Sequence, residues 1–304
     1  MSTTRKSGRG KPGAPLFLPE NPVLSLFSPS GPAVPKEAAR GRKSLRGLGV
    51  KLESMPEEEK GRPYLSGPDS LRLESVQRGM ESPESSGLLA VRGGYGATRL
   101  LTSLSGLWKN FPPKPLIGFS DVTALHLARM KACGCGGWHS PNLTTLGRLG
   151  VRKTREVLSA LKGERREPWI FPPSSVFNSG KARGPLLGGN LTLFSQLYGS
   201  GYCPDAQGHI LLLEDVDEKA YSIDRMLTLL SLKGAFLGIQ ALVFGSFEKS
   251  DDPALVAEML SDFAGTLAVP VMLNAPFGHG SDNLPWYYGE TAEFERGSLG
   301  FAVK

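Results

Sequence analysis

Short apolar runs alternate with amphipathic stretches through the first half of this 304-residue chain. Each apolar run is bounded by turn-forming residues such as Gly, Pro and Ser, a pattern that predicts a buried strand. Stretches in which apolar residues return every three or four positions predict helices. The predicted strands are 24–27, 50–52, 88–91 and 116–119, and the predicted helices are 35–48, 70–81, 100–109 and 121–130.

The same alternation resumes in the second half of the chain after a less regular segment. Residues 131–150 are rich in glycine, and an amphipathic helix is predicted over 151–162. Residues 163–182 are charged and then rich in Pro and Ser, which indicates a linker. Further helices are predicted at 191–198 and 223–232, strands at 210–213, 241–244 and 271–273, and a β-hairpin at 289–303.

Strands that alternate with helices are typical of α/β proteins built on a parallel sheet. We therefore predict two domains: an N-terminal parallel-sheet α/β domain over 21–150 and a C-terminal mixed α/β domain over 183–304. A helix and linker over 151–182 join them. Residues 1–20 are polar and rich in Gly, Ser and Pro, and we expect them to form a disordered basic tail.

Composition and charge exclude several classes of protein. A hydrophobic content of 40% with 21% charged residues is ordinary for a globular protein, and no apolar run approaches the roughly 20 residues that span a membrane. The basic residues of the tail precede its first acidic residue, Glu20, and carry four of the six net positive charges. The remaining charge is not interleaved with aromatic residues, so we expect neither a nucleic-acid partner nor a membrane partner.

The cysteine pattern bears on both location and metal binding. Cys133, Cys135 and Cys203 are odd in number and two of them are one residue apart, which fits a reducing compartment better than a disulfide framework. With no signal peptide, we predict a cytoplasmic protein. Cys133, Cys135 and His139 lack a fourth metal ligand and the usual ligand spacing, so we predict no metal site and no cofactor.

The most informative position for chemistry is Ser120. The strand predicted up to Phe119 passes directly into a helix that begins at Asp121, so Ser120 lies at a sharp corner. A serine there is exposed above the sheet, near the backbone N–H groups that open the helix. Serine at such a place is also a common helix N-cap, and Val122 replaces the second glycine of the usual nucleophile turn, so both interpretations stay open.

Glu214 and His279 share the placement of Ser120, each following an apolar strand or lying in the loop after one. Sites in parallel α/β sheets gather at this edge, and serine, histidine and a carboxylate are the set required for acyl transfer. Glu214 also belongs to the acidic run 214–218, which could be a solvated loop with Asp215 as the substitute acid. His279 could be an exposed turn residue.

The other histidines and a glycine loop complete the set of candidates. His126 is rotated by about 240° from Ser120 on a helix and should not reach it, whereas His139 and His209 stay open. The loop 92–96 lacks dinucleotide and phosphate-loop spacing, but its glycines allow close approach to a substrate. The N–H groups of Gly94 and Asp121 could therefore form an oxyanion hole.

Six motifs in register carry a resemblance to a known family. From about residue 24 to the C-terminus the chain resembles the LD-carboxypeptidases, serine peptidases that include muramoyltetrapeptide carboxypeptidase and the microcin C immunity peptidase. The motifs are Phe27-Ser28-Pro29-Ser30-Gly31-Pro32, Arg92-Gly93-Gly94-Tyr95-Gly96, Gly118-Phe119-Ser120-Asp121-Val122-Thr123-Ala124-Leu125, Gly188-Gly189-Asn190-Leu191, Leu213-Glu214-Asp215-Val216 and Phe277-Gly278-His279.

The resemblance implies the activity and the roles of the site residues. Ser120 matches the nucleophile, Glu214 the orienting acid and His279 the general base, and the oxyanion donors fall on Gly94 and Asp121. It further implies a metal-free homodimer that cleaves between an L- and a D-amino acid, releasing the terminal D-alanine of murein tetrapeptide in peptidoglycan recycling. The chain departs from the family in having Phe119 where tyrosine is usual, and in Ser140 within the usual His-Gly-Pro.

Two other functions remain open from the sequence. The same hydrolysis could act on a peptide-nucleotide antibiotic, with Trp138 and Trp286 as candidates to stack on the base. A non-catalytic peptide-binding protein is the second alternative, although it would have no need of a complete Ser/Glu/His set. An exopeptidase must also bind a terminal carboxylate, for which Arg92, Arg225 or the glycine-loop amides are candidates.

Overall fold

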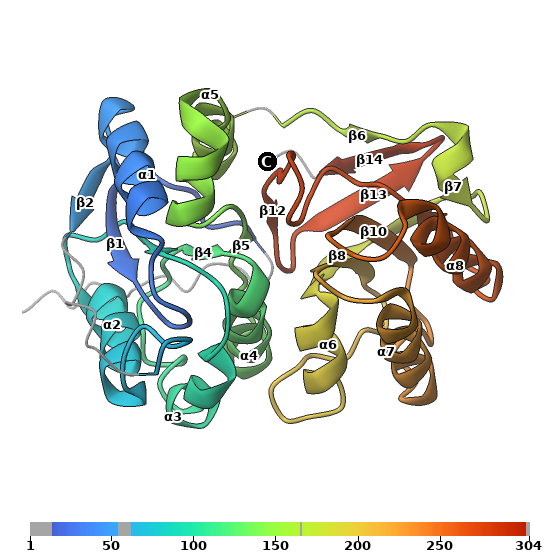
Figure 1. Cartoon of the computed structure of the whole chain (residues 1–304), viewed down its shortest axis with the longest axis horizontal. Helices are drawn as coiled ribbons and strands as arrows, with labels where there is room; N and C mark the ends of the chain where they lie inside the picture. The colour runs from blue at the N-terminus through green and yellow to red at the C-terminus, as the bar shows by residue number, and fades with distance from the viewer. Residues whose placement is uncertain (1–13, 54–61, 165, 302–304) are drawn as a thin grey trace, which may run out of the picture.

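The computed structural model describes residues 14–53, 62–164 and 166–301, and the expected α/β class is confirmed. Two sheets lie side by side, with helices packed around each of them (Figure 1). The first sheet has the order β12-β5-β4-β3-β1-β2 and is parallel except for β12. Its strands are β1 (Val23–Phe27), β2 (Lys51–Glu53), β3 (Gly87–Ala90), β4 (Leu116–Gly118), β5 (Trp138–His139) and β12 (Trp286–Tyr287).

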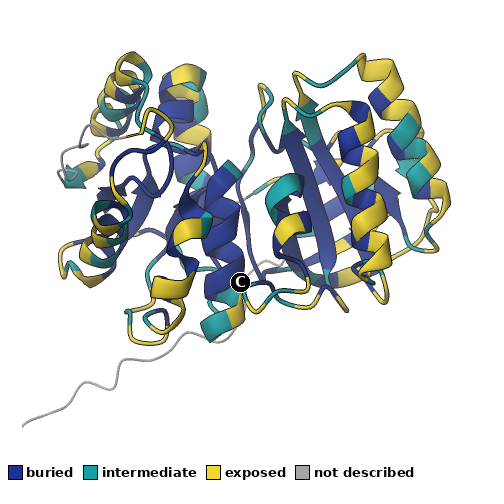
Figure 2. Ribbon diagram, turned by 60° about the horizontal axis from the view of Figure 1, so that its bottom comes forward, coloured by how far each residue is buried: buried dark blue, intermediate teal, exposed yellow. Residues whose placement is uncertain are grey.

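The helices of the first half cover this sheet and turn their exposed faces outward, whereas the strands other than the edge strand β2 are largely buried (Figure 2). The helices are α1 (Pro35–Gly47), α2 (Asp69–Glu81), α3 (Leu101–Ser105), α4 (Thr123–Cys133) and α5 (Leu143–Leu161), with 3-10 turns at Ala97–Leu100 and Ser120–Val122. The helices α1 and α5 approach each other unusually closely. A side chain on Gly41 would overlap the carbonyl of Leu143, and one on Gly147 would overlap that of Glu37.

The start of α5 differs from the prediction. A helix was expected only from 151, but it begins at Leu143, where the Asn142 side chain accepts a hydrogen bond from the Thr145 N–H at 3.0 Å. Gly150, with φ 84° and ψ 176°, is not helical and divides α5 into two segments. The helix expected over 151–162 matches the second segment, and the first segment, 143–149, was missed. Glycines in 131–150 thus serve close packing and a kink, functions that composition alone cannot distinguish from a loop.

The second sheet is mixed and has the order β6-β14-β13-β8-β9-β10-β11-β7. Its four central strands, β8 to β11, run parallel, and the outer strands are antiparallel to their neighbours. The strands are β6 (Trp169–Ile170), β7 (Val176–Phe177), β8 (Ala182–Asn190), β9 (Ile210–Val216), β10 (Ala241–Glu248), β11 (Val271–Met272), β13 (Thr291–Glu295) and β14 (Ser298–Phe301). The helices are α6 (Leu191–Leu197), α7 (Ala220–Leu232) and α8 (Pro253–Gly265), and a 3-10 turn spans Pro173–Ser175.

Two segments predicted to be irregular are instead tied to the fold. Residues 163–182, expected to be a linker, contribute β6 and β7 to the two edges of the second sheet. Of the tail predicted over 1–20, residues 1–13 lie outside the described residues. Leu18, however, is buried, its N–H donates to Leu161 O at 2.8 Å, and Leu16 O accepts from Trp138 Nε1 at 2.8 Å. The prediction of disorder is therefore wrong for 14–20, because apolar burial and paired backbone groups hold this segment.

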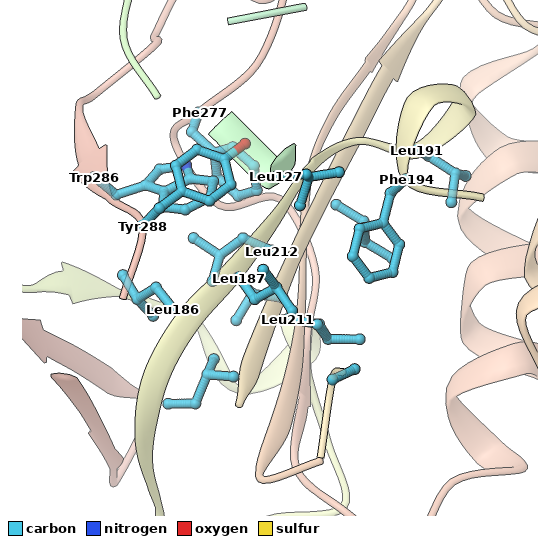
Figure 3. Packing of buried hydrophobic residues seen from close by; sticks show 14 of the residues in the cluster. Leu127, Leu186, Leu187, Leu191, Phe194, Leu211, Leu212, Phe277, Trp286 and Tyr288 are labelled. Atoms are coloured by element: carbon cyan, nitrogen blue, oxygen red, sulfur yellow. The ribbon is translucent and has the colours of Figure 1, made fainter. Parts of the chain in front are cut away.

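The C-terminal part of the chain returns to the first sheet. β12 pairs antiparallel with β5, with Trp286 opposite His139. Phe277, Trp286 and Tyr288 gather beside leucines of β8 and β9, with Leu127 of α4 next to them (Figure 3). The two sheets therefore share one hydrophobic core at the place where they meet. Within the described residues, no helix has both the length and the apolar character needed to cross a membrane.

Candidate active site

Ser120 lies in a strained turn between β4 and α4. Phe119 is still extended, but Ser120 has φ 62°, in the left-handed region that non-glycine residues rarely adopt. The 3-10 turn over Ser120–Val122 then leads directly into α4. Such strain persists only where surrounding contacts enforce it, and it is the backbone geometry of a nucleophile turn. The corner predicted at Ser120 is present. Phe119 is the residue that caps the 3-10 turn, so Ser120 is not the N-cap that the alternative interpretation proposed.

Glu214 and His279 come together at the edge of the second sheet. Glu214 on β9 is fully buried, and its Oε2 accepts a hydrogen bond from His279 Nδ1 at 2.7 Å. His279 follows Gly278, whose φ is 114° and where an added Cβ would lie 2.9 Å from Glu214 Oε2. Asn283 accepts from the Gly278 N–H at 3.2 Å, which fixes the loop. Only glycine before the histidine lets the loop approach the carboxylate this closely.

The carboxylate also controls the charge of the imidazole. Burial lowers the pKa of His279, but the negative charge of Glu214 and the hydrogen bond to it outweigh burial, so the pKa is raised above its ordinary value. With Nδ1 donating to Glu214, Nε2 of the neutral ring is left as a proton acceptor. This is the tautomer that a general base requires.

Asp215, the substitute acid, points to the other face of β9. It accepts hydrogen bonds from Asn190 Nδ2 at 2.7 Å and from the Thr192 N–H at 2.9 Å. Burial, followed by the charge of Glu214, raises the pKa of Asp215 to about 6. Asp215 therefore anchors the start of α6, and Glu214 is the acid beside the histidine.

The other three histidines have structural environments. His126 is buried, lies 3.0 Å from Gly118 O through Nε2, and has a pKa lowered to about 3 because burial disfavours its charged form. His139 is buried in an aromatic stack, and burial lowers its pKa well below the usual value. His209 Nδ1 lies 3.1 Å from Gln207 O. None of the three lines the pocket that holds Ser120.

Ser120 and His279 line one pocket of about 860 Å³. Ser120 follows a strand of the first sheet, and His279 lies at the edge of the second. The ring of Phe119, the residue before Ser120, packs against the ring of His279 with centroids 4.7 Å apart. Gly93 and Gly94 form part of the wall, and a Cβ added at Gly93 would lie 3.0 Å from Ser120 Oγ and 3.5 Å from the Asp121 nitrogen. The space beside the serine hydroxyl therefore exists because residue 93 has no side chain.

The side chain of Asp121 organises this wall, a role that sequence analysis missed. Its buried Oδ2 accepts from Ser30 Oγ at 2.6 Å and from the Ala97 N–H at 2.8 Å, while Gly31 N–H donates to Gly93 O at 3.0 Å. Burial raises the pKa of Asp121 to about 6 despite these bonds. The sequence shows only an acidic residue directly after the serine. The preference for acidic residues in the first turn of a helix explains that residue equally well.

A further hydrogen bond joins α4, the helix that follows Ser120, to the second sheet. The Asn190 N–H donates to Oγ1 of Thr123, the first residue of α4, at 3.1 Å. Gly189 has φ 110°, and a Cβ there would lie 2.6 Å from Thr123 Oγ1 and 2.5 Å from the Tyr288 hydroxyl. The Gly-Gly-Asn motif thus permits the close approach of β8 to α4.

Charged side chains surround the pocket. Arg92, a sequence candidate for binding a carboxylate, lines it and donates to Pro32 O at 3.0 Å. Arg225 does not line it and lies on α7 over the ring of Tyr221, 5.6 Å from its centroid. Five other charged residues line the pocket and were not predicted to do so: Arg148, Lys249, Glu37, Asp217 and Glu248. Their positions depend on the α1–α5 contact and on loops after β9 and β10, which no local pattern reveals.

The remaining candidates do not line the site. Trp138 and Trp286 are fully buried within β5 and β12, so neither forms a wall of this pocket. The three residues considered as metal ligands have different environments: His139 packs on Trp286 with ring centroids 5.0 Å apart, whereas Cys133 and Cys135 are half-buried. Across the described ranges, no group of three or more His, Cys, Asp or Glu side chains could hold a metal ion.

Most of the chain matches the two domains of one protein family. The model of the LD-carboxypeptidase N-terminal domain matches residues 24–140, and that of the C-terminal domain matches residues 183–294. A murein tetrapeptide carboxypeptidase of Pseudomonas aeruginosa is 33% identical over 251 residues, covering 78% of this chain and 81% of that protein.

Two solved structures share the fold. A muramoyltetrapeptide carboxypeptidase from Oxalobacter formigenes superposes with a TM-score of 0.80 and 25% identity, covering 92% of this chain and 97% of the other. The microcin C7 self-immunity protein MccF, in complex with aspartyl sulfamoyl adenosine, gives a TM-score of 0.81 at 21% identity, covering 95% and 98%.

Replacing Gly93 tests the space beside the serine. In Gly93→Ala the new methyl group lies against Ser120, so we expect kcat/KM to fall about 10²–10³-fold, as when an oxyanion donor is lost. The melting temperature should change little. Gly106→Ala is the control, because a Cβ there meets nothing within 4 Å. Equal kcat/KM in the two variants would contradict this description of the site.

Replacing Glu214 tests its control of His279. Because the base must be neutral, activity should be lost as the pH falls through the raised pKa of His279. Glu214→Gln removes the charge that raises this pKa, so the acidic limb of the kcat/KM profile should move to lower pH. The plateau should fall about 10³–10⁴-fold, because the ring is no longer held in the correct tautomer. An acidic limb that does not move would show that Glu214 does not set the pKa.

Proposed function

We propose that this chain, which belongs to the LD-carboxypeptidase family of serine peptidases, removes the terminal D-alanine of murein tetrapeptide by means of Ser120, Glu214 and His279. It is a carboxypeptidase hydrolase by family. The observation that carries the assignment of residues is the 2.7 Å contact between Glu214 and His279 on the pocket that also holds Ser120. The relative from Pseudomonas aeruginosa, a murein tetrapeptide carboxypeptidase, supports the choice of substrate.

The reaction begins with attack of Ser120 Oγ on the carbonyl carbon before the D-residue. His279 Nε2 accepts the hydroxyl proton, and Glu214 stabilises the resulting imidazolium. The N–H groups of Gly94 and Asp121 stabilise the oxyanion. His279 then returns the proton to the amine of the departing D-alanine, and a water molecule that it activates hydrolyses the acyl-enzyme. The raised pKa of His279 suits a group that must both take and give a proton near neutral pH.

The terminal carboxylate of the substrate requires a cation or N–H donors at the far side of the pocket. Arg148 is well placed, since it lies on α5 beside the His279 loop and its guanidinium approaches His279 O at 3.5 Å. Lys249, on the loop after β10, and Arg92, beside the glycine loop, complete the positive charges of the pocket. We propose that these three cations select a peptide with a free carboxyl end.

The rival functions find less support in the site. The candidates to stack on the base of a peptide-nucleotide substrate were Trp138 and Trp286, and both side chains are buried away from the pocket. A protein that only binds peptides does not need a buried carboxylate paired with a histidine, because burying that charge costs stability without serving binding. The hydrolase acting on murein peptide is therefore the function we propose.

We propose further that the protein works as a cytoplasmic homodimer in peptidoglycan recycling. Its three cysteines are thiols, which suits a reducing compartment. The groove between α7 and α8, about 720 Å³ in volume, bears the exposed Leu232 and Leu255 beside polar and acidic side chains, and these exposed leucines suit contact with a second copy. Sedimentation of the purified chain as a monomer at tens of micromolar would contradict the dimer.

The function is tested by release of D-alanine from murein tetrapeptide. The wild type should release D-alanine with or without EDTA, and a tetrapeptide ending in L-alanine should be a poor substrate. Ser120→Ala should lose activity by about 10⁴-fold or more, because it lacks the nucleophile. Ser281→Ala, which alters another serine of the same pocket, is the matched control and should retain activity. Equal release by wild type and Ser120→Ala would refute the assignment, and no release by either would refute the substrate.

A further inference from the structure

Cys133 and Cys135 lie at the end of α4 remote from Ser120. Cys133 is the last residue of the helix, Gly134 caps it, and both cysteines are half-buried thiols within reach of solvent. Neither lines the active-site pocket. We propose that these two residues form a peroxide-reactive dithiol, in which Cys133 attacks the oxidant and Cys135 then closes a disulfide with it.

The backbone already provides the spacing that the disulfide needs. The separation of the two Cα atoms depends on the conformation of the one residue between them, Gly134, with φ 68° and ψ 5°. This left-handed conformation is close to the mirror image of the right-handed helical one, so it spaces the flanking Cα atoms as a helix does, at about 5.4 Å. Disulfides span Cα separations of about 4.4–6.8 Å. Closure therefore requires rotation of side chains more than movement of the helix.

A buried cation supplies the charge that activates Cys133. Arg129, one helical turn earlier, is 2% exposed, and its NH1 is buried without a hydrogen-bond partner. Across the described ranges it forms no ion pair with a carboxylate, and its guanidinium lies 5.9 Å from the centroid of the Trp108 ring. A buried guanidinium strongly favours a negative group nearby. A Cys133 thiolate satisfies that requirement.

The local hydrogen bonds act in the same direction. The side chain of Cys135, its backbone N–H and the positive charge of Arg129 together lower the pKa of Cys133 to about 6, although burial opposes the shift. The un-ionised Cys133 thiol donates to Arg129 O at 3.2 Å. The carboxyl end of α4 disfavours an anion by about 0.3–1 kcal/mol, less than one pKa unit. Tyr287, which faces the pair from β12, has a pKa raised to about 12 by burial and stays neutral.

The chemistry balances with hydrogen peroxide as the oxidant. The Cys133 thiolate attacks one peroxide oxygen, the O–O bond breaks, and the products are a sulfenic acid on Cys133 and hydroxide. The Cys135 sulfur then attacks the sulfenic sulfur, and the S–O bond breaks as the S–S bond forms. The hydroxide that leaves takes up the Cys135 proton as water. Two thiols are thus oxidised, and one peroxide is reduced to two molecules of water.

Cys203 provides a comparison within the same chain. It is buried, and burial raises its pKa to about 12, so it remains a thiol at neutral pH and should not react. The difference between one inert and two reactive thiols is a direct consequence of burial and charge.

The test is oxidation of the full-length protein with a few equivalents of hydrogen peroxide at pH 7.4, followed by intact-mass analysis and thiol titration. The wild type and Cys203→Ser should lose two hydrogens and two thiols. Cys135→Ser should stop at a sulfenic acid on Cys133, trapped by dimedone, and Cys133→Ser should react at least tenfold more slowly. Circular dichroism confirms that each variant is folded, and none of these residues lies in the catalytic site.

A second measurement follows the charge of Cys133 directly. In Cys135→Ser, whose hydroxyl can still donate to Cys133, the rate of alkylation by iodoacetamide should rise with pH through a midpoint below that of an ordinary thiol, because the backbone N–H of residue 135 and the charge of Arg129 still favour the thiolate. A midpoint near that of an ordinary thiol, about 8.5, would overturn the proposal. Retention of all three thiols by the wild type, or oxidation of Cys203 at the same rate as Cys133, would overturn it as well.

Discussion

The packing of His139 on Trp286, where β5 meets β12, is the contact on which the proposed site depends. The two rings are nearly parallel, with centroids 5.0 Å apart. The His139 ring also packs edge-to-face with Phe119 and Phe277, at centroid distances of 5.7 Å and 5.6 Å. Phe119 precedes Ser120 and Phe277 precedes the His279 loop. One buried aromatic cluster therefore lies between the chain segment that carries Ser120 and the one that carries His279, the proposed nucleophile and base. Burial keeps the His139 ring neutral, as a packing element in this position must be.

Several carboxylates near the pocket are buried, which costs stability unless each is fully bonded. Asp121 holds Ser30 and Ala97, and Asp215 holds Asn190 and Thr192, so both are supplied with donors. Glu214 differs, because its Oε1 is buried without a hydrogen-bond partner and His279 is the partner of Oε2. The negative charge of Glu214 and its hydrogen bond to His279 raise the pKa of His279, so an interaction that costs stability also controls the protonation of the proposed base. Backbone strain at Ser120 and an unpaired carboxylate oxygen on Glu214 both cost stability, and such features are typical of functional sites.

The elements and the corner at Ser120 could be predicted because their signals are local. Apolar runs and glycines mark the strands and turns, and the placement of Glu214 and His279 follows from the rule that sites gather at one edge of a parallel sheet. The docking of 14–20, the strands within 163–182 and the early start of α5 could not be predicted, since each is stabilised by partners distant in sequence. For the same reason, the positions of Arg148 and Lys249 on the pocket could not be predicted. Which acid faces His279 depended on the side of β9 to which each residue points.

The central claim is that Ser120, His279 and Glu214 act as one unit assembled from two sheets. Labelling with a fluorophosphonate, followed by peptide mapping, tests it most directly, because the reagent reacts only with a serine that a base activates. We predict a single phosphonyl group on Ser120, a rate of labelling that falls at least about 10³-fold in His279→Ala, and a smaller fall in Glu214→Gln. Labelling of another serine, or labelling of Ser120 at an undiminished rate in His279→Ala, would contradict it.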